Sequence, residues 1–139
     1  MFRFWKKRKK RKYDWELDLI AGEISRSKRF GLSFGILAVR MSHSAPRGLS
    51  KLMPGRTMSF DVLNENMRSY DRVLDSASRR YHIILPQTDK DGVKAVTERI
   101  HKLAREYKWG KVSFGSAVYP GDGEDPQTLL NKAMGERYF

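Results

Sequence analysis

The sequence predicts an α/β sandwich, in which helices cover a sheet that contains a β-hairpin. Two observations lead to this prediction. Apolar periodicity changes along the chain in the order helix, strand, helix, strand, strand, helix, strand, helix. The chain has 139 residues, 40% of them hydrophobic, which is the size and composition of one domain with its own core. We therefore expect a single globular domain over residues 13–139, after a basic tail of residues 1–12.

The first half of the domain contains a predicted helix, a strand and a second helix. The first helix covers "DWELDLIAGEISRSKRFG" and ends at Gly31, which suits a helix C-terminus. Its apolar residues near helical spacing are Trp15, Leu17, Leu19, Ile20 and Ile24. The apolar run "LSFGILAV", residues 32–39, is typical of a central strand covered on both faces. Residues 41–56 predict a loop, and residues 57–70 a helix with Thr57 or Ser59 as its N-cap.

The second half begins with a predicted hairpin and ends with a helix. Strands are expected at residues 72–77 and 80–85, although the corner between them lacks the glycine that a two-residue turn favours. Residues 87–109 predict a helix with one apolar stripe. The stripe comprises Val93, Val96, Ile100, Leu103, Ala104 and Tyr107. A strand at residues 111–120, a turn and a helix that opens with Pro126 complete the domain.

The positive charge is concentrated in the tail, "MFRFWKKRKKRK". The net charge of the chain is +12, and eight of its 28 Lys and Arg residues lie in residues 1–12. Like-charge repulsion favours a disordered tail in the absence of a partner. Its aromatic residues and clustered cations suit an anionic membrane surface and, less strongly, nucleic-acid phosphates. Because no apolar run predicts a signal peptide or a membrane span, we expect a cytoplasmic protein that the tail can hold at the inner face of the membrane.

Composition also limits the chemistry of the chain. It contains no cysteine, which excludes a disulfide framework, a cysteine nucleophile and thiolate metal sites. The histidines His43, His82 and His101 show no metal-ligand spacing, and we expect them to be ordinary surface or strand residues. No cofactor is expected.

The order of short motifs resembles that of GGDEF domains, the diguanylate cyclase family that condenses two GTP into cyclic di-GMP. The matching stretches, within residues 15–138, are "LSFGILAV", "YDRV", "YHIILPQTDKDG", "TERI", "VSFGSAVYPGDGED", and "LLNKA" with Tyr138. Their combined spacing is more specific than any one of them. The resemblance implies a nucleotide-cyclase-like palm fold with a central mixed, largely antiparallel sheet flanked by helices.

The resemblance also implies that the catalytic signature is degenerate. Its five positions fall on Ala77, Ser78, Arg79, Arg80 and Tyr81, so that "ASRRY" stands in place of "GGDEF". The signature's acidic residues would hold divalent metal, which arginines repel. The family's "D-x-D" step at the end of the first strand falls on Ala38 and Arg40, and its guanine-reading residues have no counterpart in "HSAPRG". We therefore expect no metal and no synthesis of cyclic di-GMP.

A second family site, the product-binding "R-x-x-D", keeps both defining residues. Its register falls on "RSYD", Arg68 to Asp71. The chemistry complements guanine, since an arginine fork donates to O6 and N7 while a carboxylate accepts from the N1 and N2 hydrogens. The resemblance adds Arg99 from the long helix, and Arg72 is placed to contact phosphate. The alternative for Arg68 and Asp71 is a surface ion pair at a helix end that contributes little.

Two hypotheses follow. In the first, the chain is a catalytically inactive receptor for cyclic di-GMP that regulates a partner protein. In the second, the fold is a ligand-free module for homodimerisation or protein docking, with the tail contacting membrane or nucleic acid.

Overall fold

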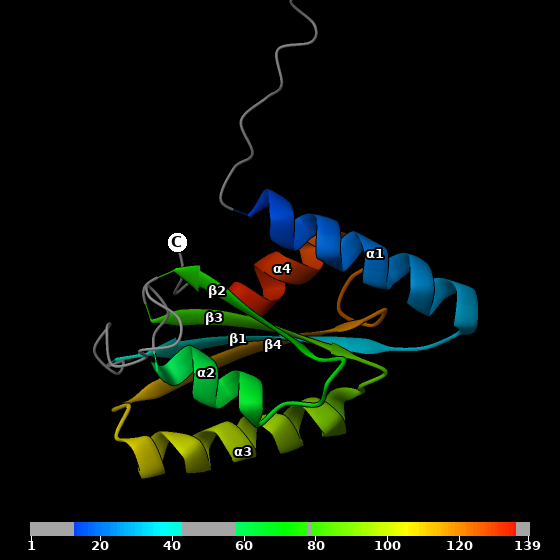
Figure 1. Ribbon diagram of the computed structural model, residues 1–139. Helices are drawn as coiled ribbons and strands as arrows, with labels where there is room; N and C mark the ends of the chain where they lie inside the picture. The colour runs from blue at the N-terminus through cyan, green and yellow to red at the C-terminus, as the bar shows by residue number, and fades with distance from the viewer. Residues whose placement is uncertain (1–12, 43–57, 78, 136–139) are drawn as a thin grey trace, which may run out of the picture.

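The structure is a computed structural model that describes residues 13–42, 58–77 and 79–135. Within these residues the chain forms four helices and four strands (Figure 1). In chain order they are α1 (Asp14–Phe30), β1 (Phe34–Met41), α2 (Met58–Glu65), β2 (Arg72–Ala77), β3 (Arg80–Pro86), α3 (Lys90–Tyr107), β4 (Val112–Tyr119) and α4 (Pro126–Met134). The order of elements predicted from the sequence is confirmed.

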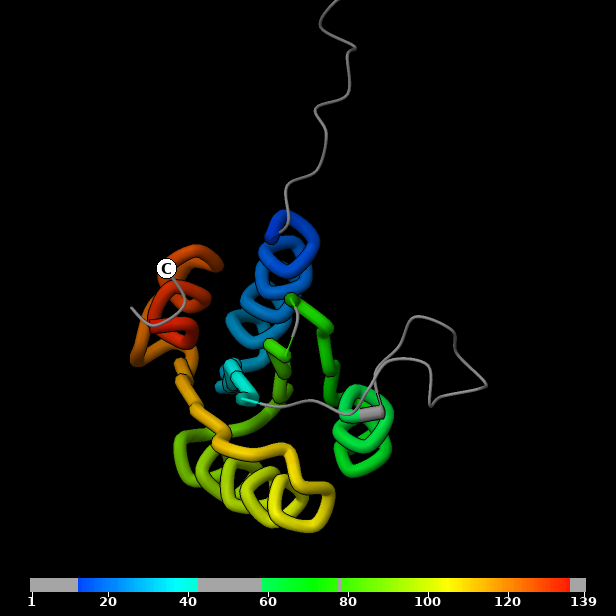
Figure 2. Tube along the Cα trace, turned by 90° about the vertical axis from the view of Figure 1, so that its left-hand side faces the viewer, coloured from blue at the N-terminus to red at the C-terminus, as the bar shows by residue number. Residues whose placement is uncertain are grey.

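The four strands form one sheet in the order β2-β3-β1-β4. Figures 1 and 2 show α1 and α4 on one face and α2 and α3 on the other. This arrangement confirms the α/β sandwich. All three strand pairings among the described residues are antiparallel, so this sheet is fully antiparallel rather than mixed.

The central strand β1 contributes to both cores. Successive side chains of a strand point to opposite faces. Leu37, Val39 and Met41 accordingly pack into the core beneath α2 and α3. Residues of the opposite parity, Phe34, Ile36 and Ala38, pack beneath α1 and α4. The predicted strand that is covered on both faces is therefore confirmed.

The first turn of α1 differs from the prediction. Trp15, expected on the buried stripe, is 64% exposed, and its neighbour Glu16 is buried instead. Glu16 is buried because its Oε2 lies 2.8 Å from Nδ1 of His82, on the buried strand β3. Apolar spacing alone does not reveal a polar pair of this kind, whose members lie 66 residues apart.

The helix α2 is shorter than predicted. It ends at Glu65 because Asn66 turns back, its Nδ2 donating to the Val62 carbonyl at 2.7 Å. Ser59 is not the N-cap but lies inside the helix, where its hydroxyl is 2.7 Å from the Tyr81 hydroxyl. The other predicted cap, Thr57, lies outside the described residues, as do the tail, most of the loop, His43, Ser78 and Tyr138, so predictions for them stay untested.

The helix α3 matches its predicted stripe with one exception. Asp89 is its N-cap and accepts a hydrogen bond from the Gly92 backbone N–H at 2.9 Å. Tyr107 is exposed, whereas the rest of the stripe is buried. None of the helices in the described part of the chain is long and apolar enough to cross a membrane.

The β2–β3 hairpin forms its turn without glycine. Ala77 pairs with Arg80, and Arg79 adopts a left-handed backbone with φ of 61°. The register shifts between Asp75 and Ala77, so β2 contains an irregularity at Ser76. Such a bulge increases the local twist of a strand and changes the direction of the residues after it.

Gly115 on β4 allows α4 to pack closely against the strand, because it has no side chain. A Cβ added to Gly115 would overlap the carbonyl oxygen of Ala133 on α4, whereas one added to Gly22 on α1 would meet no atom within 4 Å. We predict that Gly115→Ala lowers the free energy of unfolding by about 3 kcal/mol. The matched control Gly22→Ala should raise it by about 0.5–1 kcal/mol, because alanine favours helix. Urea unfolding measures both, and equal effects would contradict this packing.

Candidate functional site

Arg68 and Asp71 form a closed ion pair within one turn between α2 and β2. The Arg68 Nε–H is shared between both carboxylate oxygens, at 3.1 and 3.0 Å, and Nη2 donates to Oδ1 at 2.8 Å. The Arg68 backbone N–H donates to Oδ2 at 2.9 Å, and the Asp71 backbone N–H donates to the Arg68 carbonyl at 3.0 Å. Arg68 and Asp71 are therefore joined by hydrogen bonds from both their backbones and their side chains.

The same guanidinium also reaches the end of β3. Its Nη2 donates to the Pro86 carbonyl at 3.2 Å and to the Thr88 hydroxyl at 2.7 Å. The hydroxyl of Thr88 in turn donates to Pro86 at 2.9 Å. We call the group of Arg68, Asp71, Pro86 and Thr88 the arginine clamp. It joins the start of β2 to the end of β3 and the approach to α3.

The two charged residues of the clamp differ in how far their side chains are buried. The Asp71 side chain is 1% exposed and that of Arg68 is 38% exposed. Hydrogen bonding to Asp71, above all, raises the pKa of the Arg68 guanidinium above its ordinary value. The pair is therefore not the surface ion pair of the alternative interpretation, because the carboxylate is buried and depends on Arg68 for its compensation.

Tyr70 completes the exposed side of the clamp. The Arg68 guanidinium carbon lies 4.6 Å from the centre of the Tyr70 ring, and this ring is itself half exposed. Hydrogen bonding to Tyr70 is a further, smaller cause of the raised pKa of Arg68. The clamp thus presents a fixed cation and an aromatic ring at the surface.

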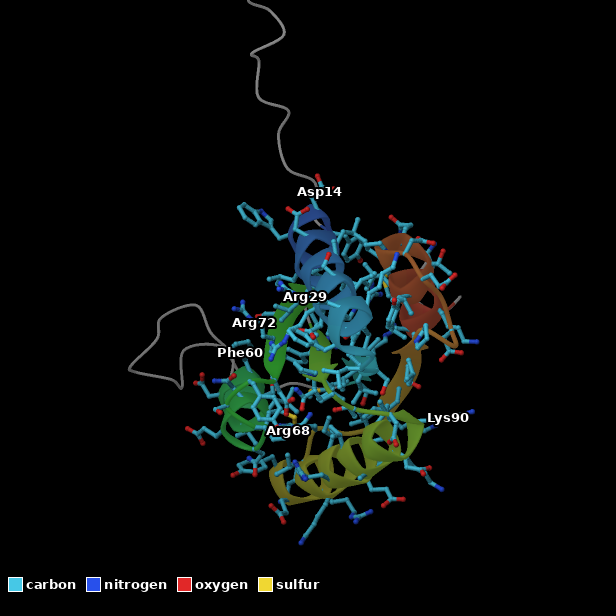
Figure 3. The ribbon with its side chains drawn as sticks, turned by 90° about the vertical axis from the view of Figure 1, so that its right-hand side faces the viewer. Asp14, Arg29, Phe60, Arg68, Arg72 and Lys90 are labelled. Carbon is cyan, nitrogen blue, oxygen red and sulfur yellow. The ribbon has the colours of Figure 1, made fainter. Side chains whose placement is uncertain are left out.

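The two further arginines expected at this site, Arg99 and Arg72, come from two different elements, α3 and β2. Arg99 on α3 reaches the turn after α2, where its Nη1 donates to the Asn66 carbonyl at 3.2 Å. Arg72 on β2 lies nearer to α1 than Arg68 does (Figure 3). Arg72 lines a cavity of about 460 Å³ together with Arg26, Ser69 and Tyr70. Tyr70 therefore touches Arg68 and borders the cavity of Arg72, which the Glu23 side chain also lines.

The residues aligned with the catalytic signature lie at the opposite end of the hairpin. Ala77, Arg79 and Arg80 form its tip, and Tyr81 is buried in the core. On β1, Ala38 is also buried and pairs with His82, while Arg40 pairs with Arg80. No three His, Cys, Asp or Glu side chains in the described residues are grouped as a metal site. With alanine and arginine in these places, the tip does not fit a divalent metal.

Sequence reasoning paired Arg68 with Asp71, but it did not connect Arg68 with Thr88 and Tyr70 or place Arg26 beside Arg72. Thr88 is 20 residues from Arg68 in the chain, so no local spacing connects them. Tyr70 lies inside the motif "RSYD", and its position between the two defining residues is the one signal that was available.

Comparison with known proteins identifies the fold. No protein-family model and no curated protein sequence matches the chain. A DGC protein from Thermotoga maritima has a TM-score of 0.63 at 20% identity, over 84% of this chain and 87% of that one. The GGDEF domain of TpbB (YfiN) from Pseudomonas aeruginosa gives 0.63 at 11% identity, over 86% and 77%. The diguanylate cyclase SiaD from the same organism, in complex with its activator SiaC, gives 0.59 at 18%, over 86% and 50%. These likenesses show a GGDEF-type fold.

The clamp predicts an unequal effect of two arginine substitutions on stability. Arg68→Ala leaves the buried Asp71 carboxylate without its compensating charge, so we expect a loss of about 2–3 kcal/mol in the free energy of unfolding. The control Arg72→Ala removes an exposed arginine four residues away and should change it by less than about 0.5 kcal/mol. Urea unfolding at neutral pH measures both. Similar values for the two variants would show that the clamp contributes nothing.

Proposed function

With the GGDEF-type fold as the starting point, we propose that this chain is a non-catalytic domain that binds cyclic di-GMP around Arg68 and regulates a protein partner. One observation supports it most directly. Arg68 is held rigidly by Asp71, stacked on Tyr70 and exposed at one edge, at the register of the family's product-binding motif. A pre-oriented guanidinium loses little conformational freedom when it binds a ligand.

The absence of catalysis is proposed from the chemistry of the hairpin tip. Condensing two nucleotides needs divalent metal to neutralise phosphate charge and to align the attacking hydroxyl. Arginine binds phosphate but supplies neither a metal ligand nor a base for that hydroxyl. The tip residues Arg79 and Arg80 therefore suit binding without turnover.

Asp71 takes a different role from the one that the motif suggests. Each of its two carboxylate oxygens accepts two hydrogen bonds from Arg68, and the side chain is buried. It therefore acts as a positioning residue rather than as an acceptor for guanine hydrogens. In this proposal Arg68 donates to guanine, the Tyr70 ring offers a stacking surface, and Arg72 contacts phosphate. Arg99 holds the adjacent turn through the Asn66 carbonyl.

A second candidate function is the ligand-free interaction module, and the closed clamp favours it. The clamp satisfies its own buried groups without any ligand, as a purely structural element would. A protein partner fits both functions, since the solved structure of SiaD contains its activator SiaC. A second copy of this chain is another candidate partner. Contact of residues 1–12 with an anionic membrane or, less favoured, with nucleic acid extends either proposal.

The proposed inactivity is tested with GTP and Mg²⁺. We expect no cyclic di-GMP after prolonged incubation, because the tip lacks metal ligands. Liquid chromatography with mass detection measures the product, and an active diguanylate cyclase under the same conditions is the positive control. Product that accumulates with time and disappears on addition of EDTA would overturn the proposal.

Receptor function is tested by titrating cyclic di-GMP into the full chain by calorimetry. We expect a dissociation constant on the order of micromolar. Arg68→Lys keeps the charge but loses the planar fork, so the affinity should fall by at least about tenfold. Arg72→Ala should also weaken binding. The matched control Arg105→Lys, an exposed arginine on α3, should leave affinity unchanged.

The outcomes separate the two candidate functions. If addition of cyclic di-GMP to the unaltered chain gives no heat in calorimetry and no change in the spectrum of the protein, the receptor function is excluded. The interaction module then remains. Binding that is insensitive to Arg68→Lys would assign cyclic di-GMP to another surface and overturn the proposed site. Thermal unfolding of each variant confirms that it is folded before titration.

A further inference from the structure

The two edges of the sheet differ in how well they are protected against pairing with another chain. The edge strands are β2 and β4, and Figure 2 shows β4 between α3 and α4. The edge at β2 carries the exposed charges of Arg72 and Asp75 and the irregularity at Ser76, which all discourage pairing. The strand β4, "VSFGSAVY", contains no charged residue, no proline and no register shift. Such an edge is a template for a further strand.

Alternate residues of β4 direct their backbone groups away from the sheet. The Val118 N–H donates to Oδ2 of Asp122 at 2.9 Å, and the Val118 carbonyl accepts from the Asp122 backbone N–H at 2.9 Å. Val118 therefore faces the outer edge and is already bonded there. Because strand residues alternate, Ser116 and Phe114 face the same edge. Their outward N–H and carbonyl groups make no hydrogen bond within the part of the chain that the structure describes.

A groove lies beside these open backbone groups, between β4 and α3, and we call it the edge groove. Its volume is about 500 Å³. Phe114 and Ser116 line it on the strand side, and Lys90, Lys94 and Thr97 line it on the helix side. These three residues of α3 lie one turn apart along the helix, so they follow the direction of the groove. An extended segment added to β4 would place every second side chain against α3.

The edge groove has an excess of positive charge. Two lysines line it, against the single carboxylate of Asp91. Lys90 also interacts electrostatically with Asp122. Lys94 is exposed and forms no ion pair with any residue in the described ranges. A free cation beside open backbone groups favours a segment that carries carboxylates, and so does the net charge of +12.

We propose that the edge of β4 binds an extended, acidic segment of a protein partner as an additional strand. The outward groups of Phe114 and Ser116 supply the backbone bonds, and Lys94 pairs with a carboxylate of the segment. A second copy of the chain fits less well. Two copies that pair β4 with β4 in antiparallel fashion carry both α3 helices on one face of the joined sheet, where their lysines repel. The proposal rests on the proposed function for the existence of a partner, but not on cyclic di-GMP binding at Arg68.

The probe is a short synthetic peptide of alternating valine and glutamate, blocked at both ends and added to the isotope-labelled full chain without cyclic di-GMP. We expect saturable NMR shifts and slower solvent exchange of the Phe114 and Ser116 amides, with a dissociation constant on the order of 0.1–1 mM. The Val118 amide should keep its exchange rate, because Asp122 already occupies it. The matched peptide with lysine in place of glutamate should bind at least about fivefold more weakly. Absence of binding, or equal binding of both peptides, would overturn the proposal without bearing on the receptor function.

Substitutions at residue 116 test the backbone bonds. Ser116→Pro removes the outward N–H but leaves the bonds to β1, and edge strands accept proline where the N–H faces solvent. We expect affinity for the glutamate peptide to fall at least about fivefold. The control Ser116→Thr keeps the N–H and should change affinity by less than about twofold. Equal affinities of the two variants would contradict strand addition at this edge. A dimer of the unaltered chain that Ser116→Pro dissociates, seen by light scattering, would assign the edge to a second copy and also overturn the proposal.

A charge reversal tests the edge groove without changing the strand. Lys94→Glu should weaken binding of the glutamate peptide at least about fivefold and strengthen binding of the lysine peptide. The control Lys102→Glu makes the same change on α3 outside the edge groove, and it should alter affinity by less than about twofold. Equal effects of both reversals would show that only net charge matters and would overturn the proposed site. If Ser116→Pro does not fold, this comparison still decides.

Discussion

The arginine clamp is the interaction on which the position of the hairpin depends. Arg68 joins Asp71 at the start of β2 to the Pro86 carbonyl at the end of β3 and to Thr88, next to the N-cap of α3. Because Asp71 is buried and a buried charge is costly without a partner, an arrangement in which Arg68 turns away from Asp71 is unfavourable. The edge strand β2, the strand β3 and the helix α3 are therefore held at a common corner of the sheet.

The two ends of the hairpin differ in how their charges are balanced. At the clamp, one buried carboxylate orders one arginine, and the result is a rigid surface with Tyr70. At the tip, the described residues that line a cavity include four cations and no carboxylate, and two of the cations, Arg40 and Arg80, make further interactions. The chain thus has a GGDEF-type fold that carries alanine and arginine at the hairpin tip.

The order of elements and both core faces were predictable from apolar spacing, because strands such as β1 and helices such as α3 bury residues at regular intervals. Polar pairs between distant segments were not. Glu16 is buried by His82, 66 residues away, and Arg68 depends on Thr88, so neither contact leaves a local pattern. The bonds of Asp71 to Arg68 also could not be read from the sequence alone. The spacing of "RSYD" brings the two charges together but does not tell whether they face a ligand or each other.

The central claim, that Asp71 holds Arg68 in place and that Arg68 is the ligand contact, is tested most directly by NMR of the arginine Nε–Hε groups. The Arg68 resonance is assigned by its loss in Arg68→Lys. We predict a slowly exchanging Arg68 Nε–Hε that shifts when cyclic di-GMP is added and stays protected from solvent, because the bond to Asp71 persists. A resonance that is rapidly exchanging in the free protein, or that saturating cyclic di-GMP leaves unmoved, would contradict it.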